Sequence, residues 1–561
     1  MKERYIDLME QALSAYSDER IKRYFDDVKR EGLTEHGFPR LTSNIGILIS
    51  HGRRVDLLPI FLEMMEFCCK VIPTVKAAND FSVREIICCL WEVEGSGIVS
   101  KENTERWRGY LKTIEVTTCY NVFATSPTDD VRNWAIFTAA SEYFRQKADL
   151  CDSADFVELQ LIQQIRWLDE NGMYQDNSSS TTKQPIMYDL VSRCLFCLIF
   201  DMGYRSDSYS VIDEGLKKAG LLTLGMQSPN GEIAFGGRSN QFLLCEAWTA
   251  AIYEYEAKRY KKEGNSELSA TFKSAAVRAL DNIEEWLSKK PILHIKNRFP
   301  LETKFGCEGY GYFDKYMITV ASNLYGAYLL CDDSIPFTFK QNHEPCVTVT
   351  SDAFHKLFLR SGGYGLEFDI NADLGYDANG LGRVQRENAP STICMSLPCP
   401  SRPKYTVDIN EPIAMSLCSA VRTEDGWSFG AEETSKYSVL ATATDKNCVS
   451  ASLHCLFENK KSTEEHYTVN EDGVSVKVKG DGDIAYALPA FCFDGETSPV
   501  IISDEHSLAV SYCGWICRYT TDGAVTDLNR IAANRNGHYR VFLASAQNEL
   551  NVKIEIIKEQ I

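Results

Sequence analysis

The sequence predicts a multidomain α+β protein, in which an N-terminal α/α toroid (an incomplete helical barrel) precedes a C-terminal antiparallel β-sandwich. Three observations support this prediction. The chain has 561 residues, too many for one hydrophobic core. Helical periodicity dominates to about residue 335, and alternation of apolar and polar residues replaces it after about residue 345. We therefore expect a catalytic toroid over residues 1–340 and a sandwich over residues 341–561.

The helical half contains several segments with the spacing of a buried helix face. In the segment that starts at Asn133, the residues Ile136, Phe137, Ala140 and Phe144 recur at intervals of three or four. Glycine and proline breakers separate segments of about 12–20 residues, and the sequence shows no repeat of fixed period. This pattern favours a helical barrel over a regular solenoid. Further helices are expected over residues 188–200, 239–260 and 313–330.

The second half alternates with a period of two. Val474-Ser-Val-Lys-Val-Lys, His538-Tyr-Arg-Val-Phe-Leu and Val552-Lys-Ile-Glu-Ile-Ile are expected strands. Asp472-Gly473 and Asp481-Gly482 are typical turn pairs. Short strands punctuated by turns indicate an antiparallel sandwich rather than βαβ units.

Composition limits the classes of partner. The net charge of −19 argues against nucleic acid, whose phosphates require a basic surface, but arginines within a site can still hold an anionic sugar. No apolar run approaches the roughly 20 residues that cross a bilayer, so we expect no membrane partner. The first residues lack the apolar core of a signal peptide, and the 20 cysteines mostly lie in apolar patterns. We expect a cytoplasmic protein with reduced thiols, which could form a homo-oligomer.

Two helix starts carry polar residues where core residues are expected. Asn133, followed by Trp134, shares a helix face with apolar residues, so its amide needs a partner or lines a polar cavity. Asp189 and Arg193 lie one turn apart after Tyr188. They are either a helix salt bridge or polar groups of an open cleft.

The segment Gly236-Gly-Arg-Ser-Asn-Gln-Phe242 is the strongest candidate site. Its glycines permit a sharp turn, and we expect Ser239 to cap the helix that follows. Arg238, Asn240 and Gln241 then crowd one helix N-terminus, which favours anions, and arginine offers a two-pronged fork for a carboxylate. The alternative is a purely structural cap.

Glycines alternate with aromatic residues just before the helix that starts near residue 313. Aromatic rings stack on sugar faces, and phenols exchange protons. The alternative is a packed aromatic turn. A polar, glycine-rich loop of the β half could also reach the toroid, or remain a surface loop. The candidate residues of these segments are Arg298, Glu308, Tyr310, Tyr312, Lys315, Tyr376 and Arg383.

Signatures of several other enzyme classes are missing. The sequence has no G-x-S-x-G, no H-E-x-x-H and no phosphate-binding G-K-[ST] motif. The nine histidines are scattered, and Cys194 and Cys197 form one C-x-x-C pair with no second pair beside it. We therefore expect neither a metal nor a cofactor.

These motifs, in this order, resemble those of the heparinase II/III-like group, which includes polysaccharide lyases. The resemblance rests on Asn133-Trp134, Tyr188-Asp189, the turn at Gly237, Glu308-Gly-Tyr310-Gly-Tyr312 and Phe354-His355. It implies an α/α toroid with a β-sandwich and cleavage of uronic-acid polysaccharides, such as glycosaminoglycans, by β-elimination. One departure is that the histidines of the helical half, His36, His51 and His294, lie outside these motifs.

β-Elimination needs a group that neutralises the uronate carboxylate, a base, and an acid for the leaving oxygen. The expected catalytic residues are Tyr312, Tyr188, Arg238 and Asn240. The expected substrate-binding residues are Asn133, Trp134, Asp189, Arg193, Gln241, Arg298, Glu308, Tyr310, Lys315, Tyr376 and Arg383.

Two other functions remain open at this point. One is a glycoside hydrolase on the same toroid, with two carboxylates drawn from Asp189, Glu246, Glu308 and Asp314. The other is a carbohydrate-binding protein without catalytic activity.

Overall fold

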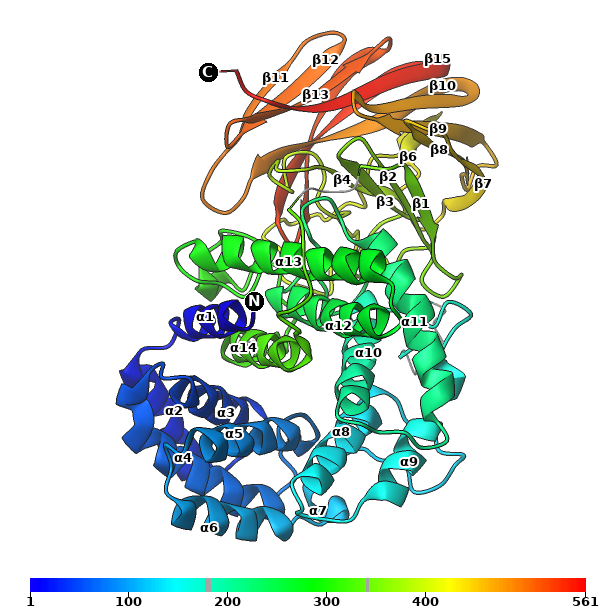
Figure 1. Cartoon of the computed structure of the whole chain (residues 1–561). Coiled ribbons are helices and arrows are strands. Elements are labelled where there is room, and N and C mark those ends of the chain that lie inside the picture. The colour runs from blue at the N-terminus through cyan, green and yellow to red at the C-terminus, as the bar shows by residue number, and fades with distance from the viewer. Residues whose placement is uncertain (177–182, 312, 340–342, 561) are drawn as a thin grey trace.

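The structure is a computed structural model that describes residues 1–176, 183–311, 313–339 and 343–560. Helices occupy the N-terminal half, and antiparallel strands occupy the C-terminal half (Figure 1). This confirms the predicted fold class. The last long helix ends at Leu330 and the first strand begins at Cys346. The domain boundary expected at residues 340 and 341 falls outside the described residues.

The long helices of the first half form two sets. The inner set is α3 (Gly37–Ser50), α5 (Val83–Ser96), α8 (Asn133–Lys147), α10 (Ile186–Asp201), α12 (Leu243–Lys262) and α14 (Phe313–Leu330). The outer set is α2 (Asp18–Glu31), α4 (Leu58–Val71), α6 (Lys101–Lys112), α9 (Ala154–Ile162), α11 (Tyr209–Met226) and α13 (Ser266–Ser288). Helix α1 (Lys2–Leu13) packs on α14, and α7 (Val116–Cys119) is one turn long.

The inner helices close a ring. Each of them packs against the next in chain order, and α14 packs back against α3. Burial follows this arrangement: every residue of α3 from Gly37 to Ile49 is buried, whereas α2 buries only Ile21, Phe25 and Val28, at intervals of four and three. A helix that is buried all round belongs inside a core, and one with a single apolar stripe covers its surface. The helical half is therefore an α/α toroid.

The β half is built from two sheets. The smaller consists of β1 (Cys346–Val349), β2 (Lys356–Ser361), β3 (Tyr364–Asp369) and β4 (Gly380–Arg386), in that spatial order. The larger has the spatial order β11-β12-β13-β15-β10-β9-β8-β7, with β14 paired to β15 and a β5-β6 hairpin paired to β10. Its strands are β5 (Ser419–Thr423), β6 (Gly426–Phe429), β7 (Lys436–Thr444), β8 (Val449–Leu456), β9 (Ser462–Asn470), β10 (Gly473–Phe493), β11 (Val500–Ser503), β12 (Ser507–Tyr512), β13 (Trp515–Thr521), β14 (Ala524–Asn534) and β15 (Gly537–Lys558).

The two sheets pack face to face over one hydrophobic core. The ring of Phe368 on β3 meets that of Tyr467 on β9 edge-on, with centroids 4.8 Å apart. Strands β10 and β15 form the spine of the larger sheet, in register from Val474 opposite Ile554 to Ala490 opposite Arg540, with one irregularity after Lys479. One end of this strand pair descends toward the helical half (Figure 1), and Asn536, just before β15, lines a pocket together with residues of α13.

Most of the expected elements are present, and one local prediction is wrong. The segments expected as helices over residues 188–200 and 313–330 correspond to α10 and α14, and the three expected strands lie in β10 and β15. Helix α12 begins only at Leu243, with Phe242 before it, so Ser239 does not cap it. The turn between Gly236 and Gln241 repeatedly enters the left-handed region, which keeps the helix from starting earlier.

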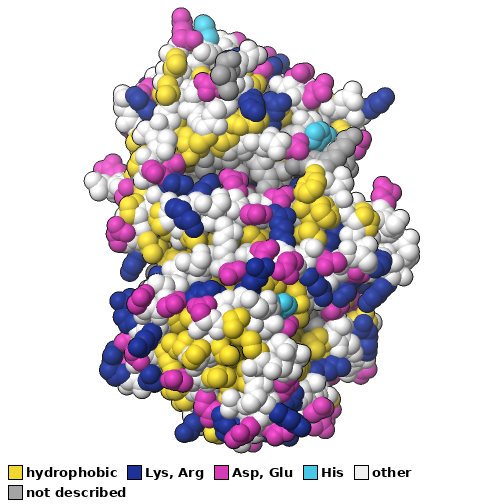
Figure 2. Space-filling model, turned by 60° about the vertical axis from the view of Figure 1, so that its left-hand side comes forward, with side chains coloured by type: hydrophobic (Ala, Val, Ile, Leu, Met, Phe, Trp, Pro, Cys, Tyr) yellow, Lys and Arg dark blue, Asp and Glu magenta, His cyan; other side chains and the backbone are white. Residues whose placement is uncertain are grey.

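The outer surface carries charges of both signs. On the face shown in Figure 2, lysine and arginine are interspersed with aspartate and glutamate. Within the described ranges, no helix combines the length and apolar character of a membrane span.

Candidate active site

The candidate site lies where inner helices of the toroid begin. The starts of α3, α5 and α8 meet there. Phe81, just before α5, packs its ring against His36 before α3 and Trp134 on α8, with centroids 4.8 and 4.6 Å apart. The first turn of α10 and the loops before α12 and α14 supply the polar residues, including Tyr188 and Arg238.

The turn before α12 has an unusual backbone. Gly236, Gly237, Ser239 and Gln241 have φ values of 150°, 74°, 60° and 68°. A Cβ at Gly237 would also lie only 3.1 Å from the Cα of Pro185, so glycine allows the turn to press against the start of α10. Left-handed conformations at non-glycine residues cost about 1 kcal/mol or more each, and such strain often concentrates at functional sites.

This turn presents a charged and phenolic cluster, which we call the phenol cluster: Tyr188, Arg238, Ser239 and Tyr310. The Nε of Arg238 donates to the Oη of Tyr310 at 2.6 Å. The Oγ of Ser239 lies 2.5 Å from that same Oη and 3.5 Å from the Oη of Tyr188. Ser239 therefore bridges two phenols, one of which is held by a guanidinium.

The cluster leaves most of the arginine free for a ligand. The side chain of Arg238 is exposed, and no described carboxylate forms an ion pair with it. Burial tends to lower the pKa of Arg238, but the oxygen atoms of Tyr188 and Tyr310 outweigh it, and the pKa is raised. The guanidinium therefore stays charged, and its Nη groups can bind an anion in two-pronged fashion.

Two phenols at the cluster, Tyr188 and Tyr376, have raised pKa values. Burial, followed by the proximity of Tyr310, raises the pKa of Tyr188 well above its ordinary value. Burial and the charge of Glu308 raise the pKa of Tyr376 to about 12. Tyr376 comes from the loop between β3 and β4, so the β half contributes to the surroundings of the cluster.

A buried ion pair supports the turn from below. Glu308 accepts from the backbone N–H of Ser239 at 2.7 Å, and Arg535 holds both oxygens of Glu308 at 2.6 and 3.1 Å. Arg535 lies between β14 and β15, with its guanidinium 4.1 Å from the ring centroid of Tyr405. Glu308 therefore positions the turn, and a residue of the β half positions Glu308.

Asp176 is a further acidic group near Arg238. Its two oxygens accept from the backbone N–H and the side-chain amide of Asn133, at 2.9 and 2.6 Å. Burial raises the pKa of Asp176 to about 6, although the bonds from Asn133 and the charges of Arg132 and Arg238 oppose this shift. Asp176 was not predicted from the sequence, because it lies 43 residues after Asn133 and no short-range pattern connects the two residues. Of the two alternatives for the Asn133 amide, a hydrogen-bond partner or a polar cavity, the structure has the partner.

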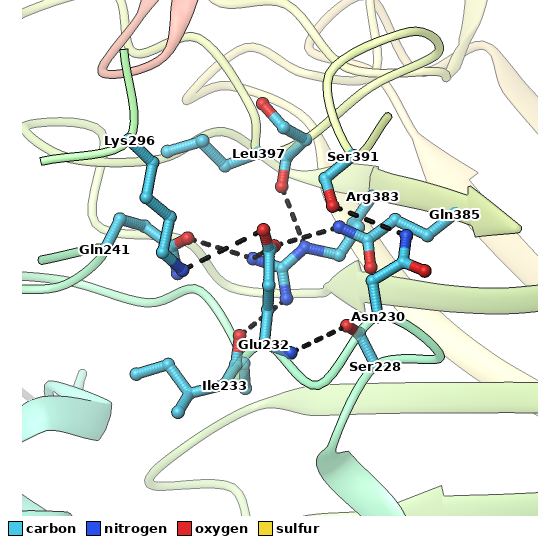
Figure 3. Close-up of polar contacts among 12 residues, drawn as sticks. Ser228, Asn230, Glu232, Ile233, Gln241, Lys296, Arg383, Gln385, Ser391 and Leu397 are labelled. Atoms are coloured by element: carbon cyan, nitrogen blue, oxygen red, sulfur yellow. Dashed lines mark hydrogen bonds and ion pairs between the residues drawn. The ribbon is translucent and has the colours of Figure 1, made fainter. Parts of the chain in front are cut away.

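Other predicted residues of the same turn face inward. The side-chain amide of Asn240 donates to the carbonyl of Ala234 at 3.2 Å and accepts from Gln241 at 2.5 Å. Gln241 in turn accepts from Arg383 at 3.2 Å (Figure 3). All three residues are buried. The hydrogen bonds of these side chains therefore stabilise the conformation of the turn.

The remaining predicted residues lie outside the phenol cluster. Trp134 and Lys315 are half-buried at neighbouring helix starts, and burial lowers the pKa of Lys315. Asp189 and Arg193 are completely buried and form an ion pair of 2.5 Å within α10. Arg298 pairs with Glu496 at the edge of the β half, away from the cluster. Tyr312 lies outside the described residues.

The carboxylates considered for hydrolysis are each paired with a cation. Asp189 pairs with Arg193, Glu246 with Lys296, Glu308 with Arg535, and Asp314 with Arg20. The first three are buried. No group of three or more His, Cys, Asp or Glu side chains in the described part of the chain is placed to hold a metal ion.

Comparisons with known proteins give matches at the level of structure. No family model and no curated protein sequence matches the chain. A heparinase III structure matches with a TM-score of 0.45 and 9% identity over 86% of this chain and 70% of that one. Heparan sulfate lyase HepC of Pedobacter heparinus matches with a TM-score of 0.34 and 9% identity, over 89% and 76%. A chondroitin AC lyase mutant of Streptomyces coelicolor A3 matches with a TM-score of 0.44 and 9% identity, over 99% and 79%.

Proposed function

We propose that this protein cleaves uronic-acid oligosaccharides or polysaccharides, glycosaminoglycans among them, by β-elimination at the phenol cluster. One observation carries the proposal: the guanidinium of Arg238 contacts a phenol at 2.6 Å and still has its Nη groups free of any described carboxylate. A cation that can hold the carboxylate of a substrate next to a proton-exchanging oxygen is the combination that this reaction requires.

The roles follow from the chemistry of each group. Arg238 holds the uronate carboxylate and so stabilises the charge that develops when the neighbouring carbon loses its proton. Tyr310 takes this proton in its phenolate form and becomes a neutral phenol, and the hydrogen bond donated by Arg238 stabilises the negative charge on its oxygen before the transfer. Tyr188, whose pKa is raised by burial, retains its proton and can donate it to the leaving oxygen. Ser239 lies between the two phenols and can return the proton from one to the other.

The ion pairs of the acidic residues favour elimination over hydrolysis. A glycoside hydrolase needs two carboxyl groups that face the same bond, one of which can donate a proton. Three of the four carboxylates considered form ion pairs in the interior: Glu308 with Arg535, Asp189 with Arg193 and Glu246 with Lys296. The fourth, Asp314, pairs with Arg20 on the surface. None of them is available as a proton donor without breaking an ion pair.

A panel of acidic glycans tests the proposal. Ultraviolet absorbance detects the new carbon–carbon double bond, and a reducing-end assay counts chain breaks in the same reaction. Elimination raises both signals in proportion, and Arg238→Ala lowers both about 100-fold or more. Reducing ends without absorbance would establish a hydrolase. Binding of a glycan without either signal would establish a binding protein.

A further inference from the structure

A groove separate from the phenol cluster runs along the seam between α13 and the larger sheet. Its main part has a volume of about 530 Å³, and a smaller part of about 240 Å³ adjoins it. Trp286 of α13, and Tyr512 and Cys513 of the β12–β13 hairpin, line both parts. We call the two parts together the seam groove. Sites for small ligands typically enclose 300–1,000 Å³, so two or three sugar rings could be accommodated.

The walls of the seam groove carry aromatic rings. Trp286 stands on one side, and Tyr512 and Trp515 stand on the other; all three are half-buried. The ammonium of Lys289 lies 3.5 Å from the ring centroid of Trp286. Partly exposed aromatic rings with polar neighbours are suited to the alternating apolar and hydroxylated faces of a sugar.

Two buried amides at the floor have unused acceptors. Asn282 and Asn536 are 4% and 2% exposed, and both line the groove. Their amide nitrogens donate to the carbonyl of Asn230 at 3.5 Å and to the hydroxyl of Ser396 at 3.1 Å. Neither Oδ1 has a partner. A buried acceptor without a partner costs about 1–3 kcal/mol, and a ligand hydroxyl would supply the missing donor.

The acidic residues that line the main part of the seam groove are already paired with cations. Glu232 lies 3.9 Å from Lys296 and 3.7 Å from Arg383 at the floor (Figure 3). Glu285 pairs with Lys289 at 3.0 Å, and Asp281 pairs with Arg4 at 2.6 Å. These carboxylates therefore do not need a cationic ligand.

One cation of the groove is not paired. Arg278 donates to the side-chain oxygen of Gln227 at 3.2 Å, and no described carboxylate forms an ion pair with it. Arg360 donates to the main-chain oxygen of the same Gln227 at 3.3 Å and likewise lacks such a partner. Burial and the neighbouring Arg360 lower the pKa of Arg278. The unpaired, partly buried guanidinium of Arg278 in the groove therefore favours an anionic ligand.

We infer that the seam groove is a second binding site, which takes an acidic oligosaccharide with its rings against Trp286 and Trp515 and an anionic substituent at Arg278. Hydroxyl groups of the sugar would donate to Asn282 and Asn536. None of the four residues of the phenol cluster lines this groove. A buried network of Gln241, Arg383 and Glu232 connects the turn that carries Arg238 to the lining of the groove (Figure 3). Such a site would hold a polymer chain on the protein without cleaving it.

Binding to a variant that cannot use the first site tests this inference. The full-length Arg238→Ala protein is titrated calorimetrically with hexasaccharides of hyaluronan, of unsulfated heparosan and of polygalacturonate, and with their carboxyl-reduced forms. We expect one molar equivalent of at least one acidic hexasaccharide to bind, and its carboxyl-reduced form to bind at least about tenfold more weakly. In this background, Arg278→Gln and, independently, Trp515→Ala should each weaken binding about tenfold, whereas Arg402→Ala, on the exposed surface, should not.

Hydrogen exchange locates the bound sugar. We expect the bound sugar to slow exchange at residues 278–289 and 512–517. The Trp515→Ala variant is an independent test of binding in case Arg278→Gln does not fold. The inference is overturned if none of the three acidic probes binds at millimolar concentration, or if a carboxyl-reduced probe binds equally well. It is also overturned if both variants retain the affinity of the parent, or if the protected segments lie elsewhere.

Discussion

Arg535 of the β half and Glu308 of the helical half form a buried, two-pronged ion pair, with contacts of 2.6 and 3.1 Å. Glu308 also accepts from the backbone of Ser239, whose hydroxyl contacts Tyr310. The sandwich therefore does more than cover the toroid, because it fixes the residue that shapes the turn of the proposed active site.

Arg535→Gln is expected to destabilise the protein and to reduce activity. Removing one partner of a buried ion pair leaves the other charge without compensation, which costs about 3–5 kcal/mol in free energy of unfolding. Denaturant titration measures this loss. Because Glu308 would no longer be fixed, kcat should fall as well. The double variant Glu308→Gln with Arg535→Met removes both charges and should recover part of the stability. Equal unfolding midpoints for wild type and Arg535→Gln would contradict this account.

Arg238→Ala is expected to lower kcat/KM about 100- to 1,000-fold, the range found when one donor to a developing charge is removed. The side chain is exposed, so the free energy of unfolding should change little. Arg402→Ala serves as the control, since Arg402 is an exposed arginine that pairs with Glu433 away from the cluster. A wild-type rate for Arg238→Ala on a confirmed substrate would remove Arg238 from the mechanism.

Ser239→Ala tests the bridge between the two phenols. The loss of the hydroxyl should lower kcat about 10- to 100-fold with little change in KM, because proton transfer rather than binding is affected. Tyr188→Phe should lower kcat by a similar factor. If the two residues act in one proton path, the double variant should be no slower than the slower single variant. Fully multiplicative losses would show that they act independently.

The raised pKa of Asp176 predicts how the free energy of unfolding depends on pH. Its folded pKa of about 6 lies above the ordinary value of 3.8, so the folded state holds this proton more tightly than the unfolded state. The stabilisation is present at low pH and is lost as the pH rises from about 4 to about 6. Because the side chain is partly exposed, we expect a loss of about 1–2 kcal/mol. Denaturant titrations of wild type and Asp176→Asn across this range should diverge. Parallel pH profiles would contradict the assignment.

The sequence predicts the layout of the fold well, because the signals for helices and strands come from short segments of the chain. Helices α10 and α14 are long, mostly apolar segments, and parts of strands β10 and β15 alternate between apolar and polar residues; both signals depend only on neighbouring residues. The turn at Arg238 is also visible, because two glycines followed by polar residues interrupt an apolar pattern. These signals require no knowledge of distant segments.

The supporting residues could not be predicted in the same way. Arg535 is 227 positions from Glu308, and the contact exists only because the β14–β15 turn reaches the helical half. Asn240 and Gln241 lie in the turn where polar residues were expected, but their side-chain amides point into the interior. The backbone of this turn is left-handed at Ser239 and Gln241. Such directions depend on backbone angles, which composition and spacing do not specify.

Cleavage in water enriched in heavy oxygen, followed by mass spectrometry of the products, tests the central claim most directly. Elimination breaks the bond between carbon and the leaving oxygen without adding water, so we predict that neither new chain end contains oxygen from the solvent and that one end carries an unsaturated uronate. One atom of solvent oxygen per cleavage, with no unsaturated product, would contradict the proposed chemistry at Arg238 and Tyr310.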